Sequence, residues 1–496
     1  MIYAKGIALL LFTISAFSLA FRFYKKNETH KSLISIILGG FILRGYCMAD
    51  AFLHDWDERY HALVAKNLAE NPLVPILFKT PVLPYDFQQW TLSHVWLHKQ
   101  PLALWLMAGS IKIFGTTEFA VRFPSLILSL IGIYLTFRIA TFFSNERTGL
   151  LAAFFQSING LVIQIATGRE ATDHIDNTFF FFIELSVFGI VLFLERKKTV
   201  NLLLIGLWLG LALLSKYLPA LIVLPLFILL TVDQNGYKNK IINTLYIFFT
   251  AALIAMPWQI YIFHTFPIEA NWESHYNFLH LTQALEKHDG TFLRHFYWAT
   301  EIWNVLIPLV MLWFFYQLFQ NRMDKKLWAL ATWIGVPYIF FSIVATKMVA
   351  YPLFVAPAIF TIIALFCIEL FDKQLVIKWL NPLILSILFF FALRYTYICV
   401  QPFAPTTEKA KITEILRGWK NQIPSDGKAV IFNTPYYVEI MFYHNITAAY
   451  PNLPTEEQIK DLQEKGYTIM VVKNEAVPAN LLNKNGVQFL SERGAF

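Results

Sequence analysis

Residues 176–198 read DNTFFFFIELSVFGIVLFLERKK, and this stretch carries the pattern that decides the fold. The apolar run from 176 to 194 is long enough to cross the hydrocarbon core of a bilayer, which takes about 20 residues of helix. The run ends in Arg196-Lys197-Lys198, a basic cluster typical of the cytoplasmic end of a span. We therefore predict a membrane-spanning helix here.

Similar apolar runs recur along the chain and predict about twelve spans in all. They lie at 7–24, 33–50, 122–143, 149–167, 176–194, 200–215, 217–232, 242–264, 301–319, 327–345, 351–371 and 375–398. The sixth and seventh runs are short and meet at Ser215-Lys216. No small-residue cleavage site follows the first run, which favours a span over a cleavable signal peptide.

The composition also indicates a multi-spanning membrane protein. Of 496 residues, 57% are hydrophobic and only 15% are charged, whereas soluble proteins carry about a quarter charged residues. Mean hydropathy is +0.51. These values exclude a disordered chain and a coiled coil, and the three cysteines have no disulfide or zinc spacing. The net charge of +7 lies in short runs between apolar segments, so we expect membrane lipids and no nucleic acid as partners.

The basic connections set the expected orientation. Every connection after an odd-numbered span is short and basic, near 25–31, 147, 196–198, 238–240, 322–326 and 373. The positive-inside rule makes these connections cytoplasmic. The other connections then lie outside the plasma (inner) membrane, at about 51–121, 168–175, 265–300, 346–350 and everything after about 399. These segments are rich in Asp, Glu, His and Trp, so we expect function at the outer face.

The fold class that follows is an all-α polytopic membrane domain over 1–399 with a small extracytoplasmic α/β domain over 400–496. In the tail, 428–433 and 467–472 are predicted strands. Thr434 is expected to cap a helix through Tyr443. Thr455 and Gln458 form a capping-box pattern that opens a helix ending at Gly466.

The first outer loop is the richest in chemistry. It starts His54-Asp55-Trp56-Asp57-Glu58-Arg59-Tyr60-His61, and carboxylates at the mouth of a span need solvent, a cation or a partner. The next residues have helical spacing with polar Lys66 and Asn67 opposite, which predicts a helix with Asp57 and Glu58 at its N-terminus. The alternative role for Asp55 or Asp57 is helix capping. Further along, His94 and His98 have the spacing to share a helical face, or belong to an interfacial belt.

A series of motifs then follows in a fixed order over about 50–360. These are Asp57-Glu58 with Ala62, His98-Lys99-Gln100-Pro101-Leu102, Phe114-Gly115 with Glu118 to Ser125, Arg169 to Asp173, Ser215-Lys216, and Phe341-Ser342 with Thr346-Lys347, Tyr351 and Pro357. In this order they resemble the membrane glycosyltransferases of the GT-C superfamily. Within it, the aminoarabinose transferases and the protein O-mannosyltransferases are the most similar branches.

The resemblance implies transfer of a sugar from a polyprenyl-phosphate donor to an outer acceptor such as lipid A, another glycolipid, a polysaccharide or a protein. Asp57 is the expected base, with Asp55 in reserve. Asp173 is expected to orient the acceptor, with Asp176 as the alternative at that position; pairing with Arg169, four residues earlier, is the other role open to Asp173. The donor phosphate would be bound by Lys99, Lys347, Lys216 and Arg169. For each lysine, snorkelling at a helix end is the alternative role. We also expect substrate contacts from Glu58, Arg59, Tyr60 and Tyr351.

Two positions depart from the family pattern. His61 stands where the family has Tyr, and His98-Lys99-Gln100-Pro101 stands where it has Glu-Lys-Pro-Pro. The family associates that Glu with a divalent metal, and imidazole is a good zinc ligand. His98 and His275 are therefore candidate ligands for Zn, Mg or Mn, and a solvent-exposed side chain is the alternative for His275.

A membrane transporter or lipid flippase is the alternative function. It would place ionisable residues inside its spans. Arg44, near the outer end of the second run, is the one clear candidate for such a charge. The other notable residues gather on one face, which favours an enzyme.

The orientation is tested by cysteine labelling from outside, in a background without the native cysteines. We expect engineered sites near 90, 285 and 450 to react and sites near 197 and 323 to stay protected, with both termini outside. Labelling near 197 together with protection near 285 would reverse the assignment.

Overall fold

The structure is a computed structural model that describes residues 2–231, 236–373, 379–405, 407–475 and 477–491. These residues form two compact units. The helical unit comprises Met1–Met48, Ser125–Pro267 and Glu273–Phe403, and the loop–tail unit comprises Ala49–Pro124, Ile268–Trp272 and Ala404–Phe496. The first long loop and the tail thus fold together although they are far apart in the chain. The division into domains at about residue 400 stays a prediction.

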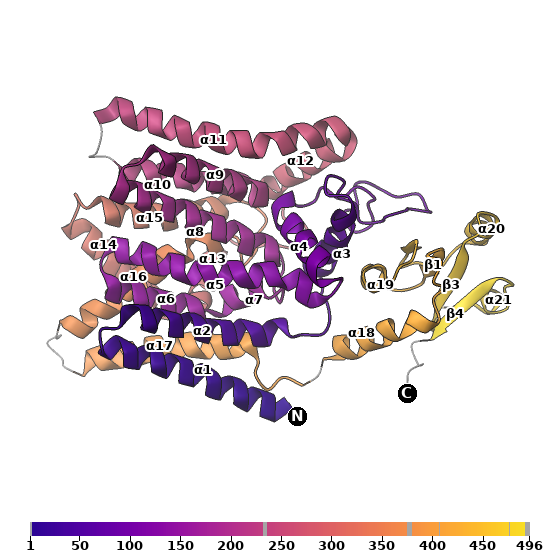
Figure 1. The fold of residues 1–496 in the computed structure, drawn as a ribbon, viewed down its shortest axis with the longest axis horizontal. Coiled ribbons are helices and arrows are strands. Elements are labelled where there is room, and N and C mark those ends of the chain that lie inside the picture. The colour runs from indigo at the N-terminus through magenta and orange to yellow at the C-terminus, as the bar shows by residue number, and fades with distance from the viewer. Residues whose placement is uncertain (1, 232–235, 374–378, 406, 476, 492–496) are drawn as a thin grey trace. The chain divides into compact units, whose positions relative to one another are not determined.

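Long apolar helices make up the helical unit and lie side by side in it (Figure 1). Their bounds are α1 (Ile2–Lys25), α2 (Thr29–Met48), α5 (Glu118–Phe143), α6 (Glu146–Ile158), α7 (Gly160–Ala166), α8 (Asp173–Arg196), α9 (Thr199–Lys216), η1 (Leu218–Ile222), α10 (Val223–Leu230), α11 (Gly236–Thr265), α12 (Pro267–Thr282), α13 (Arg294–Ile302), α14 (Ile307–Gln320), α15 (Lys325–Ile343), η2 (Leu353–Val355), α16 (Ala356–Asp372) and α17 (Leu380–Val400).

The chain is a multi-pass membrane protein. Among the described residues, nine helices are long and apolar enough to cross a bilayer, and two bent helix pairs bring the number to eleven. Each expected run has a helical counterpart, but Leu218–Leu230 is too short to span, so the expected seventh span is not supported. Pro219 and Pro225 explain the 3-10 start of that segment, because proline cannot donate a backbone hydrogen bond. Position 232 and positions 375–378 of the expected runs lie outside the described residues.

Each of the two bends is occupied by an asparagine. Between α6 and α7, which meet at 59°, Asn159 accepts from Val162 N and donates to Ile302 O at 2.7 Å. Between α13 and α14, which meet at 102°, Asn304 accepts from Leu306 N and donates to Leu388 O at 2.8 Å. Backbone groups freed at membrane depth need such partners, because no water is available there.

Buried polar groups join the helices of this unit from inside. Arg44 on α2 is fully buried, as expected, and binds Ser129 Oγ at 2.8 Å and Ser157 O at 2.8 Å. Glu184 on α8 is also buried and accepts from Thr136 at 2.7 Å and from Gln156 at 2.9 Å. The sequence reasoning missed this second charge. These contacts connect α2, α5, α6 and α8 to one another. They explain the burial of Arg44 by its role in helix packing, and they give no support to the alternative function as a transporter.

The loop–tail unit combines helices of the first loop with a small α/β domain. Its elements are α3 (Asp57–Glu70), α4 (Pro101–Phe114), α18 (Glu408–Gly418), η3 (Trp419–Asn421), β1 (Ala429–Phe432), α19 (Tyr437–Tyr443), β2 (Ala448–Ala449), α20 (Glu456–Glu464), β3 (Thr468–Lys473), α21 (Ala479–Leu482) and β4 (Val487–Ser491). The strands form one parallel sheet in the order β2-β1-β3-β4. The expected α/β domain is confirmed.

A compact core stabilises this sheet. It comprises Val430, Phe432, Ile459, Leu462, Ile469, Val471, Val477 and Leu481, and Val82 and Leu83 of the first loop pack against it. The capping box at α20 is confirmed, with Gln458 N donating to Thr455 Oγ1 at 3.2 Å and Thr455 N donating to Gln458 Oε1 at 2.9 Å. Thr434 does not cap α19, because the helix starts later, at Tyr437, and Thr434 Oγ1 accepts instead from Tyr436 N.

Candidate active site

The expected acidic pair lies in the first turn of α3. Trp56 is the residue before the helix, with φ of 63°, and its indole is 68% exposed. Trp56 is the N-cap residue and its side chain makes no capping hydrogen bond, so neither Asp55 nor Asp57 occupies the N-cap position. Asp57 and Glu58 are both buried, and the dipole of the helix favours negative charge at this end.

Asp57 forms an ion pair with Lys99. The distance from Lys99 Nζ to Asp57 Oδ2 is 3.4 Å, and the side chains are 19% and 10% exposed. Lys99 lies just before α4, which starts with Pro101, a residue suited to the first position of a helix. The structure therefore brings together the expected base and an expected phosphate-binding cation. This arrangement offers a proton acceptor next to a site for an anion.

Glu58 is fully buried and holds the loop that precedes α3. Its carboxylate accepts from Arg122 at 2.7 Å and 2.8 Å in a bidentate pair. Arg122 also donates to Asp50 O at 2.6 Å and to Phe52 O at 2.5 Å. A buried, hydrogen-bonded bidentate pair is geometrically specific, so it fixes the path of the chain into Asp57. A substrate contact by Glu58 stays a prediction.

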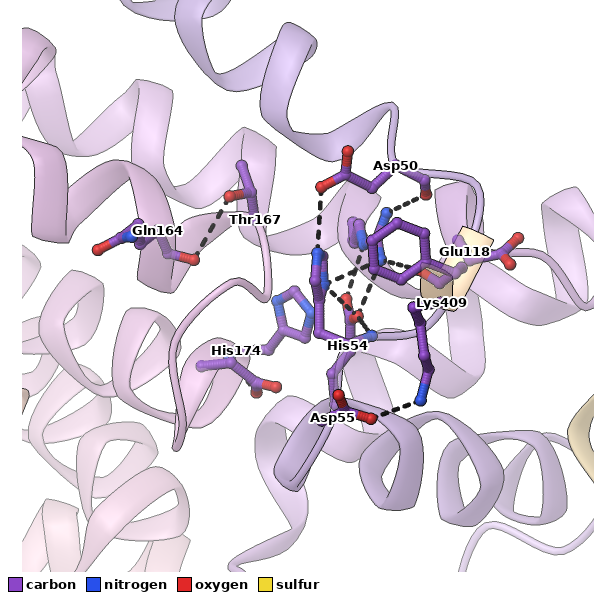
Figure 2. Close-up of polar contacts among 12 residues, drawn as sticks. Asp50, His54, Asp55, Glu118, Gln164, Thr167, His174 and Lys409 are labelled. Atoms are coloured by element: carbon purple, nitrogen blue, oxygen red, sulfur yellow. Dashed lines mark hydrogen bonds and ion pairs between the residues drawn. The ribbon is translucent and has the colours of Figure 1, made fainter. Parts of the chain in front are cut away.

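His54 bonds to carboxylates on both sides. Its Nδ1 lies 2.6 Å from Glu58 Oε2, and its Nε2 lies 3.1 Å from Asp50 Oδ2 (Figure 2). Burial alone would lower the pKa of His54, and Arg122 opposes protonation as well. Glu58 and Asp50 outweigh both effects and raise the pKa above its ordinary value of 6.5.

Arg59 and Tyr60 turn toward the tail. Arg59 Nη1 lies 3.4 Å from Glu439 Oε2, and the hydroxyl of Tyr60 lies 2.9 Å from that of Tyr437. Lys66 of the same helix donates to carbonyls at the end of α19. The face of α3 that was expected to be polar and opposite the core is therefore a contact face. Substrate contacts by Arg59 and Tyr60 stay predictions.

A second polar cluster lies in the helical unit. Lys216, at the end of α9, forms an ion pair with Asp176 in the first turn of α8, and Thr172 donates to the same carboxylate. The ammonium of Lys216 also lies 4.7 Å from the centre of the Tyr351 ring. Lys216 and Tyr351 were both expected in the site, and the structure brings them together. Asp173, which follows Thr172 in the sequence, is fully buried, and its Oδ1 accepts a hydrogen bond from His174 N.

Lys347 and Arg169 bind the ends of helices. Lys347 is 4% exposed and donates to the carbonyls of Phe341 at 2.9 Å, Ser342 at 2.7 Å and Val344, so all three of its N–H groups have backbone acceptors. Burial lowers the pKa of this ammonium. Arg169 donates to Val400 O at 2.9 Å, at the end of α17. Their binding to phosphate stays a prediction, which for Lys347 requires release of these bonds.

The candidate metal ligands lie in ordinary surroundings. His98 stacks on Trp90 with the ring centres 4.6 Å apart, and His275 is exposed on α12. Residues 91–100 are not helical, so His94 and His98 do not share a helical face, and Val95 forms a bridge with Ile76 instead. Within the described ranges, no group of three or more His, Cys, Asp or Glu side chains is placed to hold a metal ion. Binding of a divalent metal by His98 or His275 stays a prediction.

The sequence reasoning assigned no role to several residues at this site. His54 and Arg122 lie within quoted motifs, but their pairing depends on the path of the chain between α2 and α5. Lys409 and Glu439 lie in the tail with no recognised motif around them. The weak signal for Glu439 is its position among apolar residues in Tyr437–Tyr443, where an unpaired carboxylate would be costly.

The His54 contacts predict a pH-dependent stability. Because the pKa of His54 is raised on folding, its contribution is fully present below about pH 6.5 and is lost as pH rises through the higher folded value. We expect His54→Gln to lower the thermal unfolding temperature in detergent at about pH 5.5 more than at about pH 8.5. His30→Gln, an exposed histidine on α2, is the control. An equal loss at both pH values would contradict the assigned protonation.

Comparisons with known proteins agree with the motifs. The profile of the dolichyl-phosphate-mannose-protein mannosyltransferase family matches residues 98–261. An undecaprenyl phosphate-alpha-4-amino-4-deoxy-L-arabinose arabinosyl transferase from Pseudomonas fluorescens is 23% identical over 301 residues, covering 57% of this chain and 49% of that protein. A protein of the same name from Pectobacterium atrosepticum is 25% identical over 285 residues, covering 53% and 48%. The match thus spans about half the length of these relatives.

Solved structures share the fold. ArnT from Cupriavidus metallidurans, bound to undecaprenyl phosphate, superposes with a TM-score of 0.61 at 12% identity, covering 87% of each chain. The archaeal oligosaccharyltransferase AglB from Archaeoglobus fulgidus superposes with a TM-score of 0.56 at 13% identity, covering 87% of this chain and 68% of that one. The resemblance that the motifs predicted is therefore confirmed, and the chain has the fold of the GT-C membrane glycosyltransferases.

Proposed function

We propose that this protein moves a sugar from a polyprenyl-phosphate donor to a hydroxyl on an extracytoplasmic acceptor such as lipid A, another glycolipid, a polysaccharide or a protein. The observation that carries the proposal is the ion pair between Asp57 and Lys99 at the start of α3. The fold shared with an ArnT bound to undecaprenyl phosphate, and the relatives named as undecaprenyl-phosphate arabinosyl transferases, support the same conclusion.

The chemistry needs one proton acceptor and one anion site. Asp57 takes the proton of the acceptor hydroxyl while the oxygen of that hydroxyl bonds to the anomeric carbon of the sugar. The bond from that carbon to the phosphate oxygen breaks, and its electron pair stays on the departing polyprenyl phosphate. Lys99 stabilises the negative charge that the phosphate gains. Before substrate binds, each of the two charges is compensated by the other.

The donor phosphate has further candidate ligands in the helical unit. Lys216 carries charge beside Tyr351 and shares Asp176 with Thr172, so a phosphate would compete with that carboxylate. Lys347 would have to leave its backbone acceptors. We place Lys99 first for this reason. A divalent metal stays a proposal, which the transfer assay tests when it is run with and without a chelator.

We place the reaction at the outer face of the plasma membrane. The basic connections near 25–31, 147 and 196–198, which precede the unsupported seventh run, support this orientation, because positive charge favours the cytoplasmic side. The donor is an amphiphile whose phosphate lies at headgroup depth. The loop that carries Asp57 follows the end of α2 in the chain.

The first test replaces Asp57 by Asn, which has nearly the same shape but accepts no proton. The measurement is release of undecaprenyl phosphate from undecaprenyl-phosphate 4-amino-4-deoxy-L-arabinose, with lipid A as the acceptor probe. We expect a loss of about 10²–10⁴-fold in kcat, as for other general bases.

Asp86→Asn is the matched control for Asp57→Asn, since Asp86 is an exposed carboxylate of the same loop. Near-native turnover in Asp57→Asn would remove Asp57 from the reaction and leave Asp55 or Asp173 as the leading base.

The second test replaces Lys99 and Lys347 by Met, singly and together. Methionine keeps much of the stem volume and removes the charge. If both lysines bind one phosphate, each single change lowers kcat/KM for the donor, and the double change costs less than the sum of the two in free energy. Lys112→Met, an exposed position on α4, is the control. Additive losses would assign separate roles, and unchanged activity in both single variants would direct the search to Arg169.

A further inference from the structure

We propose that the α/β domain of the tail positions the first turn of α3 for catalysis, and that Glu439 on α19 is the positioning residue. The inference rests on the proposed function, because it concerns how Asp57 is placed. Glu439 acts on Asp57 indirectly. It acts through two cations, Arg59 and Lys409.

Glu439 is fully buried and binds both cations. Its Oε2 lies 3.4 Å from Arg59 Nη1, and its Oε1 lies 2.7 Å from Lys409 Nζ. Lys409 also binds Asp55 Oδ1 at 2.5 Å, an ion pair drawn in Figure 2. Asp55 and Arg59 flank Asp57, each two residues away. One carboxylate of the tail therefore fixes the chain on both sides of the expected base.

A second contact aligns the rest of α3 with the same domain. Lys66 lies two helical turns after Arg59, so the two side chains project from one face of α3. Lys66 Nζ donates to the carbonyls of Met441 at 2.7 Å and Phe442 at 2.9 Å, and to that of His444 at 3.2 Å, which caps the end of α19. Burial lowers the pKa of Lys66 to about 8. The two helices are thus joined at two points and cannot slide independently.

Aromatic contacts close the same interface. The hydroxyl of Tyr437 donates to Thr91 O at 2.6 Å and lies 2.9 Å from the hydroxyl of Tyr60. Phe78 of the first loop stacks on Tyr437 and Tyr450, with ring centres 6.3 Å and 5.4 Å away. Glu439 is itself fully buried, so its ion pairs lie away from bulk water, which strengthens them.

The charges of this network depend on Glu439. Burial alone would lower the pKa of Arg59 and of Lys409, but Glu439 and Asp55 together, with Tyr60 and Tyr437 for Arg59, outweigh that effect and raise both. Removing the carboxylate leaves two half-buried cations close together, with the exposed carboxylate of Asp55 on Lys409 as their counter-charge, which is unfavourable. The segment 55–59 can relieve this repulsion only by moving. A general base must stay within hydrogen-bond reach of the proton it takes, and a displacement of about 1 Å can cost about 100-fold in rate.

The test compares Glu439→Gln with the wild-type chain in the undecaprenyl-phosphate 4-amino-4-deoxy-L-arabinose assay. We expect kcat to fall about 10- to 100-fold while KM for the donor changes less than about twofold, because orientation rather than binding is lost. Glu439→Asp, which keeps the charge, should recover part of the loss. Lys409→Met should act in the same direction as Glu439→Gln.

Ile459→Val is the matched control for a loosened domain. Ile459 lies in the core of the same domain, on α20, and contributes to no contact of the Glu439 network. The inference requires kcat to stay near wild type in this variant. Equal losses of kcat in Ile459→Val and Glu439→Gln would overturn the inference. An unchanged kcat in Glu439→Gln together with an inactive Asp57→Asn would also overturn it, and that second result would leave the proposed function standing.

A measurement without turnover separates the two proposals. Amide hydrogen exchange in peptides covering 57–70 should be faster in Glu439→Gln than in wild type, and unchanged in Ile459→Val. If wild type releases no undecaprenyl phosphate, the proposed function fails, while faster exchange still supports the contact between the tail and α3. Unchanged exchange in Glu439→Gln overturns the positioning inference whatever the activity.

Discussion

The absence of water in the hydrocarbon core is the constraint on which the helical unit depends. Every backbone group there must find a partner inside the protein, so the apolar runs become helices. The same constraint explains the exceptions. Where the backbone is interrupted, Asn159 and Asn304 supply hydrogen bonds to the adjoining turn and to neighbouring helices. Arg44 satisfies the same requirement by giving its donors to Ser129 and to backbone carbonyls.

In the loop–tail unit, ion pairs between side chains fix the positions of the chain segments. Glu58 with Arg122 fixes the chain before α3, Asp57 with Lys99 joins the starts of α3 and α4, and Glu439 joins α3 to the tail. A buried ion pair adds little net stability, because desolvation offsets the attraction, but removing one member is costly. Such pairs therefore fix where chain segments lie. This is a useful property next to a reacting group that must be placed accurately.

The local features of this protein could be predicted from its sequence, and the long-range ones could not. The run 176–194 lies within α8, and the Thr455 capping box is present. Asp57 and Lys99 were each expected in the site because each belongs to a motif, and the structure joins them in an ion pair. Local periodicity placed Lys66 on a polar face, but a partner from α19 covers that face. Glu439 and Lys409 carry no pattern, since only the fold brings them to α3. Glu184 was hidden because a single carboxylate barely lowers the hydropathy of its run.

The contact between α3 and the tail has a consequence for biosynthesis. Arg59 and Glu439 are 380 residues apart in the chain. Synthesis proceeds from the N-terminus at about 5–20 residues per second, so the first loop waits tens of seconds for its last partner to be made. During that interval Arg59 and Lys66 lack the acceptors that the finished protein gives them. The first loop is thus translated well before the tail and completes its structure only after the tail has been made.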